Sequence, residues 1–226
     1  MSSPIGPDLG QSERAAANSG RRLVGRIAGR LARTVVPRRY MVGRRGRRVR
    51  ISQSTRIAGG SFIAFGDDVD IAGLCWLLVP GFEAHAKDGP SRLSIGSGTS
   101  IGEACTISAA HHVFIGSNVL FGPRVWITDH NHVYEDTTKP IKDQGWSTGG
   151  SVDIEDNCWL GTGAVVIGVR PIRIGRGSVI GANAVVTTDV SPYSVVAGNP
   201  ARVISQFDSA ASEWRRTDAA PRTEAQ

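Results

Sequence analysis

A six-residue spacing of bulky apolar side chains runs through most of this chain. Between residues 51 and 186, an aliphatic or aromatic residue recurs at every sixth position in series such as Ile95, Ile101, Ile107 and Ile174, Ile180, Val186. Glycine often follows the aliphatic residue, which lets the backbone turn. The spacing predicts very short strands joined by tight corners. Because such strands cannot enclose a core alone, we expect them to stack coil upon coil.

Two other fold classes fit the spacing poorly. A β-sandwich would show strict alternation of apolar and polar residues with turns every 8–12 residues or so, and helices would show a 3.6-residue period. The chain has 226 residues, of which 40% are hydrophobic, enough for one principal core. We therefore expect one all-β domain over residues 46–205, followed by a C-terminal tail over 206–226 with a short helix around Trp214.

The basic charge of the chain lies in its first 50 residues. They hold 13 Arg against two acidic residues, a net charge of +11, whereas the formal net charge of the whole chain is only +6. Within residues 1–45, apolar side chains recur every four positions between the arginines, which predicts a basic amphipathic helix: Leu23, Ile27, Leu31 and Val35. Such a helix suits either a cap on the body or peripheral binding to an anionic membrane surface; we do not expect a nucleic-acid partner.

Cysteine usage and hydropathy bear on the compartment. The three cysteines are an odd number without a CxxC pair, which favours buried reduced thiols over disulfides or a cysteine zinc site. There is no apolar run of about 18 residues and no signal-peptide pattern at the N-terminus. We expect a cytoplasmic protein, with the inner face of the membrane as a possible site of attachment.

The repeat is interrupted twice, at residues 74–92 and at residues 133–151. Insertions into a stacked repeat are extruded to its surface, where function resides. The second interruption carries Trp146 as a flat binding surface and Gly145, Gly149 and Gly150 for bending. We expect this segment to form a protruding loop that closes a cleft.

Residues 152–204 contain three phrases in order: VDIEDNCWLGTGAVVIG, IGRGSVIGANAVVTTDV and AGNPARVI. With the hexapeptides and the preceding histidines, the chain resembles the hexapeptide-repeat acyltransferases, including sugar and polysaccharide O-acetyltransferases, over roughly residues 46–205. The resemblance implies a left-handed parallel β-helix with coils of about 18 residues. It also implies a homotrimer with active sites between subunits, and acetyl-CoA or another acyl-CoA as the donor; we expect no metal.

The same resemblance assigns roles to individual residues. Its catalytic histidine falls seven residues after the valine of a GPxV turn, which gives His132 here, with His130 as a neighbour that orients the site or the acceptor. Histidine suits the removal of a hydroxyl proton because its unperturbed pKa is near 6.5. Trp146 and Glu103 are the acceptor-side candidates. On the donor side the matching positions are Trp159, Thr162, Ala182, Thr187 and Arg202.

These features predict an acyl-CoA-dependent O-acyltransferase acting on a sugar, glycolipid or polysaccharide precursor. Three alternatives stay open. An N-acyltransferase on an amino-sugar needs less help with deprotonation of its nucleophile, and a non-catalytic β-helix scaffold would leave the histidines incidental. The third is a zinc site of the carbonic-anhydrase kind: the separation of His112 from His130 equals one coil in the expected geometry, and His111 lies beside them.

Overall fold

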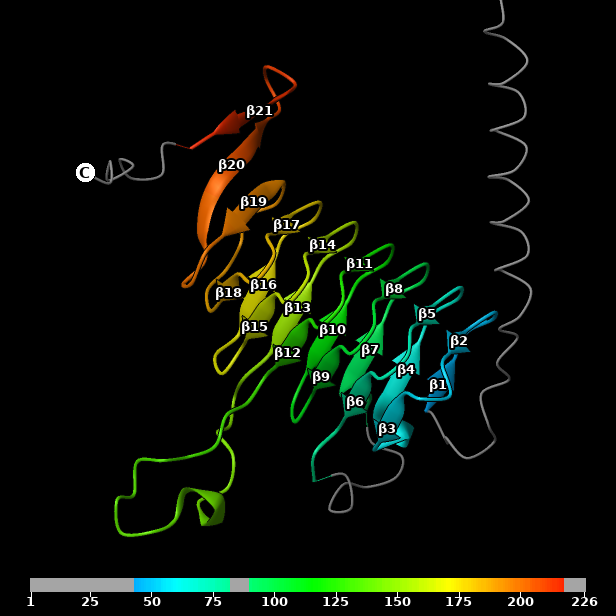
Figure 1. Ribbon diagram of the computed structural model, residues 1–226, viewed down its shortest axis with the longest axis vertical. Helices are drawn as coiled ribbons and strands as arrows, with labels where there is room; N and C mark the ends of the chain where they lie inside the picture. Colours follow the sequence, from blue (N-terminus) through cyan, green and yellow to red (C-terminus); the bar gives the residue numbers. More distant parts are fainter. Residues whose placement is uncertain (1–42, 82–89, 218–226) are drawn as a thin grey trace, which may run out of the picture. The chain divides into compact units, whose positions relative to one another are not determined.

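The computed structural model describes residues 43–81 and 90–217, and these form a parallel β-helix of stacked three-strand coils followed by a hairpin (Figure 1). The expected N-terminal amphipathic helix lies outside the described residues. Each coil contributes one strand to each of three sheets, here called A, B and C. Sheet A contains β1 (Arg44–Arg45), β4 (Ile63–Phe65), β7 (Leu93–Ile95), β10 (Val113–Ile115), β13 (Val152–Ile154) and β16 (Ile172–Ile174).

Sheet B begins with β2 (Arg50–Ile51), β5 (Asp70–Ile71), β8 (Ser100–Ile101), β11 (Leu120–Phe121), β14 (Trp159–Leu160) and β17 (Val179–Ile180). It continues with β19 (Ser194–Ala197) and then with the antiparallel strands β20 (Arg202–Asp208) and β21 (Glu213–Arg216). Sheet C contains β3 (Arg56–Ala58), β6 (Trp76–Leu78), β9 (Thr106–Ser108), β12 (Trp126–Thr128), β15 (Val165–Ile167) and β18 (Val185–Val186). Two single turns of 3-10 helix, η1 (Gly60–Phe62) and η3 (Ile141–Asp143), complete the described elements.

The uninterrupted coils are longer than expected. Strand pairing joins Arg50 to Asp70, Leu93 to Val113 and Val152 to Ile172, so these coils take 20 residues rather than about 18. The last coil is shorter, with 16 residues from Val179 to its partner Val195. The two extra residues lie at the corner where sheet C gives way to sheet A, in agreement with the eight-residue steps at 107–115 and 166–174. This register decides which residues of neighbouring coils lie one above the other.

The core is the column of inward aliphatic side chains that the six-residue spacing predicts. In sheet C, for example, Leu77, Ile107, Ile127 and Val166 are consecutive partners across coils and are fully buried. The three cysteines are also buried and free, as expected. A stack of apolar rungs of this kind is stabilised mainly by burial of apolar surface between coils.

Two boundaries differ from the sequence prediction. Residues 76–78 belong to the repeat, because Leu77 pairs with Ile57 and Ile107 of the neighbouring coils. The first interruption therefore begins only after β6. The expected helix around Trp214 is wrong: Trp214 lies in β21 and pairs with Phe207 of β20. Phe207 packs edge to face on Trp214 at a centroid distance of 5.6 Å and in a tilted arrangement on Tyr193 at 6.3 Å, which favours the hairpin over a helix.

A ladder of ion pairs joins the first described coil to the second. Arg47, Arg48 and Arg50 contact the carboxylates one coil later, those of Asp67, Asp68 and Asp70. These exposed pairs neutralise three of the positive charges of the first 50 residues, and pairs of this kind add little to stability. No helix among the described residues is long and apolar enough to cross a bilayer.

Candidate active site

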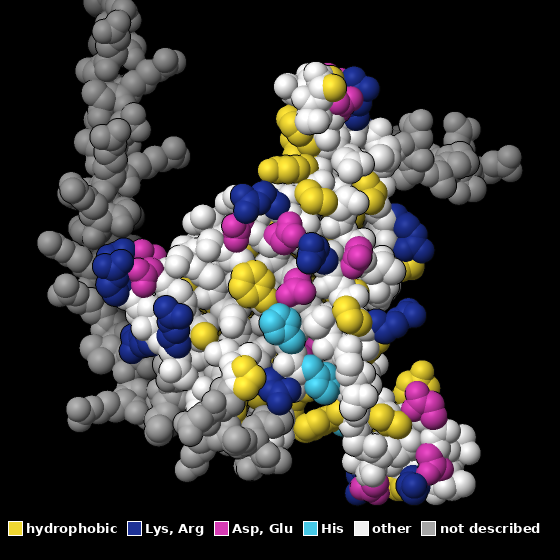
Figure 2. Space-filling model, turned by 180° about the vertical axis from the view of Figure 1, so that it is seen from behind, with side chains coloured by type: hydrophobic (Ala, Val, Ile, Leu, Met, Phe, Trp, Pro, Cys, Tyr) yellow, Lys and Arg dark blue, Asp and Glu magenta, His cyan; other side chains and the backbone are white. Residues whose placement is uncertain are grey.

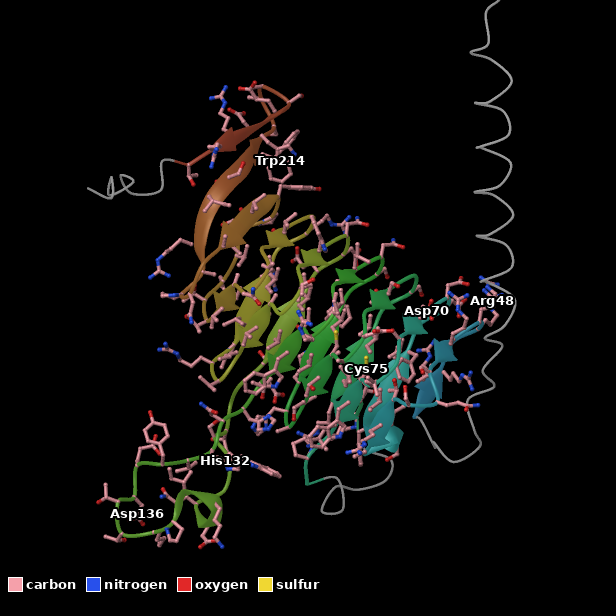
Figure 3. All side chains as sticks on the ribbon, viewed as in Figure 1. Arg48, Asp70, Cys75, His132, Asp136 and Trp214 are labelled. Carbon is pink, nitrogen blue, oxygen red and sulfur yellow. The ribbon has the colours of Figure 1, made fainter. Side chains whose placement is uncertain are left out.

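The second interruption leaves the solenoid at the corner between sheets C and A, after β12, and returns at β13 (Figure 1). Its root is a short antiparallel ladder. The Ser147 amide donates to the Asn131 carbonyl at 2.8 Å, the Val133 amide donates to the Gly145 carbonyl at 3.1 Å, and His132 pairs with Trp146 between them. His132 therefore lies where the loop joins the body, with the rest of the loop projecting beyond it (Figure 3).

Asp129 is the anchor of this corner. Its side chain is 0% exposed, and its carboxylate accepts hydrogen bonds from three consecutive backbone amides of the preceding coil, those of Ala110, His111 and His112, at 2.7–2.8 Å. Burial raises the pKa of Asp129, but the hydrogen bonds from the His130 ring and from these amides outweigh it, so the pKa lies below its ordinary value. The carboxylate is thus held as an anion.

The fourth donor to Asp129 is the ring of His130. Nδ1 of His130 lies 2.8 Å from Oδ1 of Asp129, and the side chain is only 12% exposed. Oγ1 of Thr128 lies 3.3 Å from the same Nδ1 and donates to the His130 carbonyl at 2.9 Å. Because an ionised carboxylate can only accept, Nδ1 carries the proton and Nε2 is the basic atom of the neutral ring.

Trp146 brings the two loop-root histidines together. Its ring centroid lies 5.7 Å from that of His130 and 6.4 Å from that of His132. A methyl group built on Gly81 would lie 3.5 Å from Cζ3 of Trp146, so the backbone after β6 is within van der Waals reach of the indole. His132 is exposed, and among the described residues its ring has no hydrogen-bond partner.

The other two histidines of this corner have structural contacts. Nε2 of His111 lies 2.8 Å from the Ser147 carbonyl, tying the returning loop to the preceding coil, and Nε2 of His112 lies 3.1 Å from Oδ1 of Asp153. The stacking of His112 on His130 that the zinc alternative needs does not occur, because the observed register pairs Ser108 with Thr128 and so places Ala110 one coil before His130. Histidine and acidic side chains reach the surface near the loop on the face shown in Figure 2.

The predicted donor-side residues occupy a different corner. Trp159 lies in β14, and Thr162 and Ala182 follow in the turns between sheets B and C of successive coils, where the Asn183 amide donates to the Thr162 carbonyl at 2.9 Å. Glu103 lies in the same column of turns, since its carbonyl accepts from the Arg124 amide at 2.8 Å. Sheet C separates all four from the histidines within one chain.

The last two predicted residues lie at the C-terminal end of the solenoid. Arg202 begins β20 and lines a hollow together with Thr188, Asp189 and Val203, while Thr187 directly follows β18 and is exposed. The guanidinium of Arg202 is exposed, and its Nη1 donates to the neighbouring Ala201 carbonyl at 2.9 Å.

The sequence places Asp129 where it could hold the tautomer of a neighbouring imidazole, but it does not predict what anchors the carboxylate. The three amide donors belong to the turn of the preceding coil and become neighbours of Asp129 only in the observed register.

Comparisons with known proteins agree with the fold. Residues 151–188 match the family described as the hexapeptide repeat of succinyl-transferase. A putative acetyltransferase of Schizosaccharomyces pombe is 35% identical over 46% of this chain and 48% of its own length. The galactoside O-acetyltransferase of Lactococcus lactis is 33% identical over 53% of this chain and 55% of its own length. The chain thus spans about half the length of the curated relatives it matches.

Among solved structures, the N-acyltransferase AntD from Bacillus cereus, in complex with dTDP and 3-hydroxybutyryl-CoA, superposes with a TM-score of 0.60 at 20% identity, over 72% of this chain and 82% of that chain. Its likeness concerns the fold, and the expected left-handed parallel β-helix is confirmed. The chain therefore has the left-handed parallel β-helix fold, its residues 151–188 match a hexapeptide-repeat family, and the relatives it resembles are named as acetyltransferases.

Proposed function

We propose that this protein is an acyl-CoA-dependent O-acyltransferase that transfers an acyl group, in the first instance acetyl, to a hydroxyl of a sugar, glycolipid or polysaccharide precursor. The observation that carries the proposal is the loop root, where His130 is bonded to a buried carboxylate and His130 and His132 both lie against Trp146. A basic imidazole can accept the proton of a weakly acidic sugar hydroxyl. The aromatic ring beside it offers a flat surface for the sugar.

The chemistry is a direct transfer. An imidazole of the His130–His132 pair accepts the hydroxyl proton as the oxygen attacks the thioester carbonyl. The tetrahedral intermediate then expels the CoA thiolate with cleavage of the C–S bond, and the imidazolium returns a proton to the sulfur. The spacing in the sequence assigns the base to His132; both rings adjoin Trp146, which suits a role in holding the acceptor.

The site requires a second copy of the chain. The histidines lie at one end of the strands of sheet C, and Trp159, Thr162 and Ala182 lie at the other. In a homotrimer with sheet C facing the threefold axis, the histidine corner of one copy meets the donor corner of the next. The outer face of sheet C suits such an interface, because Trp76 and Trp126 are 45% and 46% exposed in the single chain and alternate with Thr106.

The donor then lies along the column of turns between sheets B and C. Thr162 and Ala182 offer backbone groups at coil spacing for the amides of pantetheine, and Arg202 offers a guanidinium for phosphate at the C-terminal end. The expected roles of Glu103 on the acceptor side and Thr187 on the nucleotide side complete the proposal.

The test is CoA release by the full chain, with acetyl-CoA and a panel of methyl hexosides. The double variant His130→Gln/His132→Gln is expected to lose about 100-fold or more of kcat, the lower range for a general base. His112→Gln is the matched control, because its ring contacts Asp153 and lies apart from Trp146. Full turnover by the folded double variant would refute the proposal.

A second candidate is N-acyl transfer to an amino-sugar, which the fold shared with AntD favours. Methyl glucosaminide in the same panel separates the two. Preference for the amine, with turnover that does not depend on the histidine pair, would establish N-acylation in place of O-acylation.

A further inference from the structure

We propose that Asp129 is a positioning residue that fixes the ring of His130 in one tautomer, and that Nε2 of His130, rather than the ring of His132, is the proton acceptor of this site. The inference rests on the proposed acyltransferase function. It departs from the assignment that sequence spacing gives.

The first step is the immobility of Asp129. Oδ1 accepts from the Ala110 amide and from His130 Nδ1, both at 2.8 Å, and Oδ2 accepts from the His111 and His112 amides, both at 2.7 Å. Four short hydrogen bonds, three of them from the backbone of another coil, leave this carboxylate no room to rotate. The imidazole it holds is therefore attached to the frame of the solenoid and not to the projecting loop.

The second step is the chemistry of the pair. Because Nδ1 must donate to the anion, Nε2 of the neutral ring has a free lone pair, and among the described residues it has no hydrogen-bond partner. When Nε2 takes a proton, the buried anion stabilises the imidazolium that forms. A carboxylate assists a histidine base in two ways: it orients the ring, and it stabilises the charged state of the ring.

Within the described part of the chain, His132 has no carboxylate partner to orient its ring or to stabilise its charged state. Its side chain is exposed, and no carboxylate among the described residues contacts its ring. An exposed imidazole that no hydrogen bond orients must lose side-chain entropy when it aligns with a hydroxyl. We infer that His132 contacts the acceptor from the side of Trp146.

Within residues 43–81 and 90–217, the titratable side chains around His130 are Asp129 on its own turn, His111 and His112 on the turn of the preceding coil, and His132 across Trp146. Of these, Asp129 is the one whose side chain contacts the His130 ring directly.

Asp129→Asn is the informative variant. In this variant the amide oxygen takes the place of Oδ2, because two backbone amides donate there. The NH2 group then takes the place of Oδ1, and its hydrogens point at the Ala110 amide and at His130 Nδ1. The ring must then accept at Nδ1 and carry its proton on Nε2, the wrong tautomer for a base. We expect kcat to fall by about 100-fold or more, with little change in KM for acetyl-CoA.

The matched control is Asp153→Asn, which removes a carboxylate from His112 on the surface and leaves His130 untouched. We expect its kcat to stay within about threefold of the wild type, as is usual for an exposed polar exchange. The single variants complete the set: His130→Gln should lose as much kcat as Asp129→Asn, and His132→Gln should lose mainly acceptor affinity, seen as a rise in acceptor KM.

A second readout is independent of turnover. Nitrogen-15 NMR of the histidine rings distinguishes Nδ1–H from Nε2–H, with the His130 signals assigned through His130→Gln. We expect Nδ1–H in the wild type and in Asp153→Asn, and Nε2–H in folded Asp129→Asn. Should Asp129→Asn fail to fold, the wild-type tautomer and the two single histidine variants still decide the question.

An Nε2–H signal for His130 in the wild type would overturn the inference, as would a His132→Gln variant that loses more kcat than His130→Gln. Failure of the underlying function has a different signature: the wild type would transfer no acetyl group to any acceptor of the panel while His130 still shows the Nδ1–H tautomer.

Discussion

Gly150 provides a test of whether the position of Asp129 governs activity. A methyl group built on Gly150 would lie 1.8 Å from the Asp129 carbonyl oxygen and 2.4 Å from the Gly168 carbonyl oxygen. Real contacts of this kind are essentially never shorter than 3.0 Å, so in Gly150→Ala either the Asp129 backbone or the end of the loop must move until the 1.8 Å separation reaches that limit. Both opposing atoms belong to the backbone and cannot rotate away.

The expected cost is at least about 3 kcal/mol of unfolding free energy, the upper part of the range for overpacked sites. For a chain of this size that corresponds to a decrease of about 6–12 °C in Tm. The catalytic effect is separate: a displacement near 1 Å at a reacting group can lower kcat by about 100-fold. The assay is kcat for acetyl transfer per folded molecule, alongside a thermal melt.

Gly149→Ala is the matched control, one residue away. Gly149 has φ +80 and no atom within 4 Å of a built methyl group, so alanine strains its own backbone without pushing on Asp129. We expect a loss of about 1–2 kcal/mol and a kcat close to that of the wild type. Equal kcat values for folded Gly150→Ala and Gly149→Ala would refute the argument that the loop end positions Asp129.

Three further predictions concern the interface, the acceptor and pH. In the proposed trimer, Trp126→Arg should separate the subunits, seen as monomers in sedimentation, and abolish transfer. Trp214→Arg on the hairpin should leave the proposed oligomer intact; a trimer that survives Trp126→Arg would remove sheet C from the proposed interface. Trp146→Ala should raise the KM for the acceptor by about 5–10-fold, the equivalent of one aromatic contact, and leave the KM for acetyl-CoA unchanged. Equal changes in the two KM values would contradict a role of Trp146 on the acceptor side. Because hydrogen bonds lower the folded-state pKa of Asp129 below its unfolded value near 3.9, its contribution to stability is complete above that value and is lost as the pH falls through the folded-state pKa. The difference in unfolding free energy between wild type and Asp129→Asn should therefore shrink as the pH falls below about 4; a difference that grows below that pH would contradict the assignment.

The fold followed from the sequence because one spacing is repeated along most of the chain. A six-residue period can be satisfied only if Ile101, Ile107 and their equivalents face one interior, as they do. The hairpin was missed for the opposite reason: residues 202–216 have no repeat, and their strands are stabilised by contacts among Tyr193, Phe207 and Trp214 that no local pattern specifies.

The site was only half predictable. Proximity of His130, His132 and Trp146 follows from their places at the two ends of one loop, and the structure brings them together. The glycines of the loop illustrate the limit. Gly145 and Gly149 have positive φ, as expected for bending, but Gly150 is required for close approach to the Asp129 carbonyl, which depends on packing between coils.

The length of the coil is the physical link between fold and chemistry here. With coils of the shorter, expected length, the residue below His130 would be His112, and the corner would present a stack of imidazoles suited to a metal. In the longer coil that is observed, the turn of the preceding coil instead presents the amides of Ala110, His111 and His112 to Asp129, and these hold the carboxylate that orients His130. The two added residues of this corner thus bring backbone amides, rather than the imidazole of His112, to the turn that carries Asp129 and His130. Shortening the corner between β9 and β10 to the expected coil length should therefore release Asp129 and abolish the Nδ1–H signal of His130, even where the solenoid still folds.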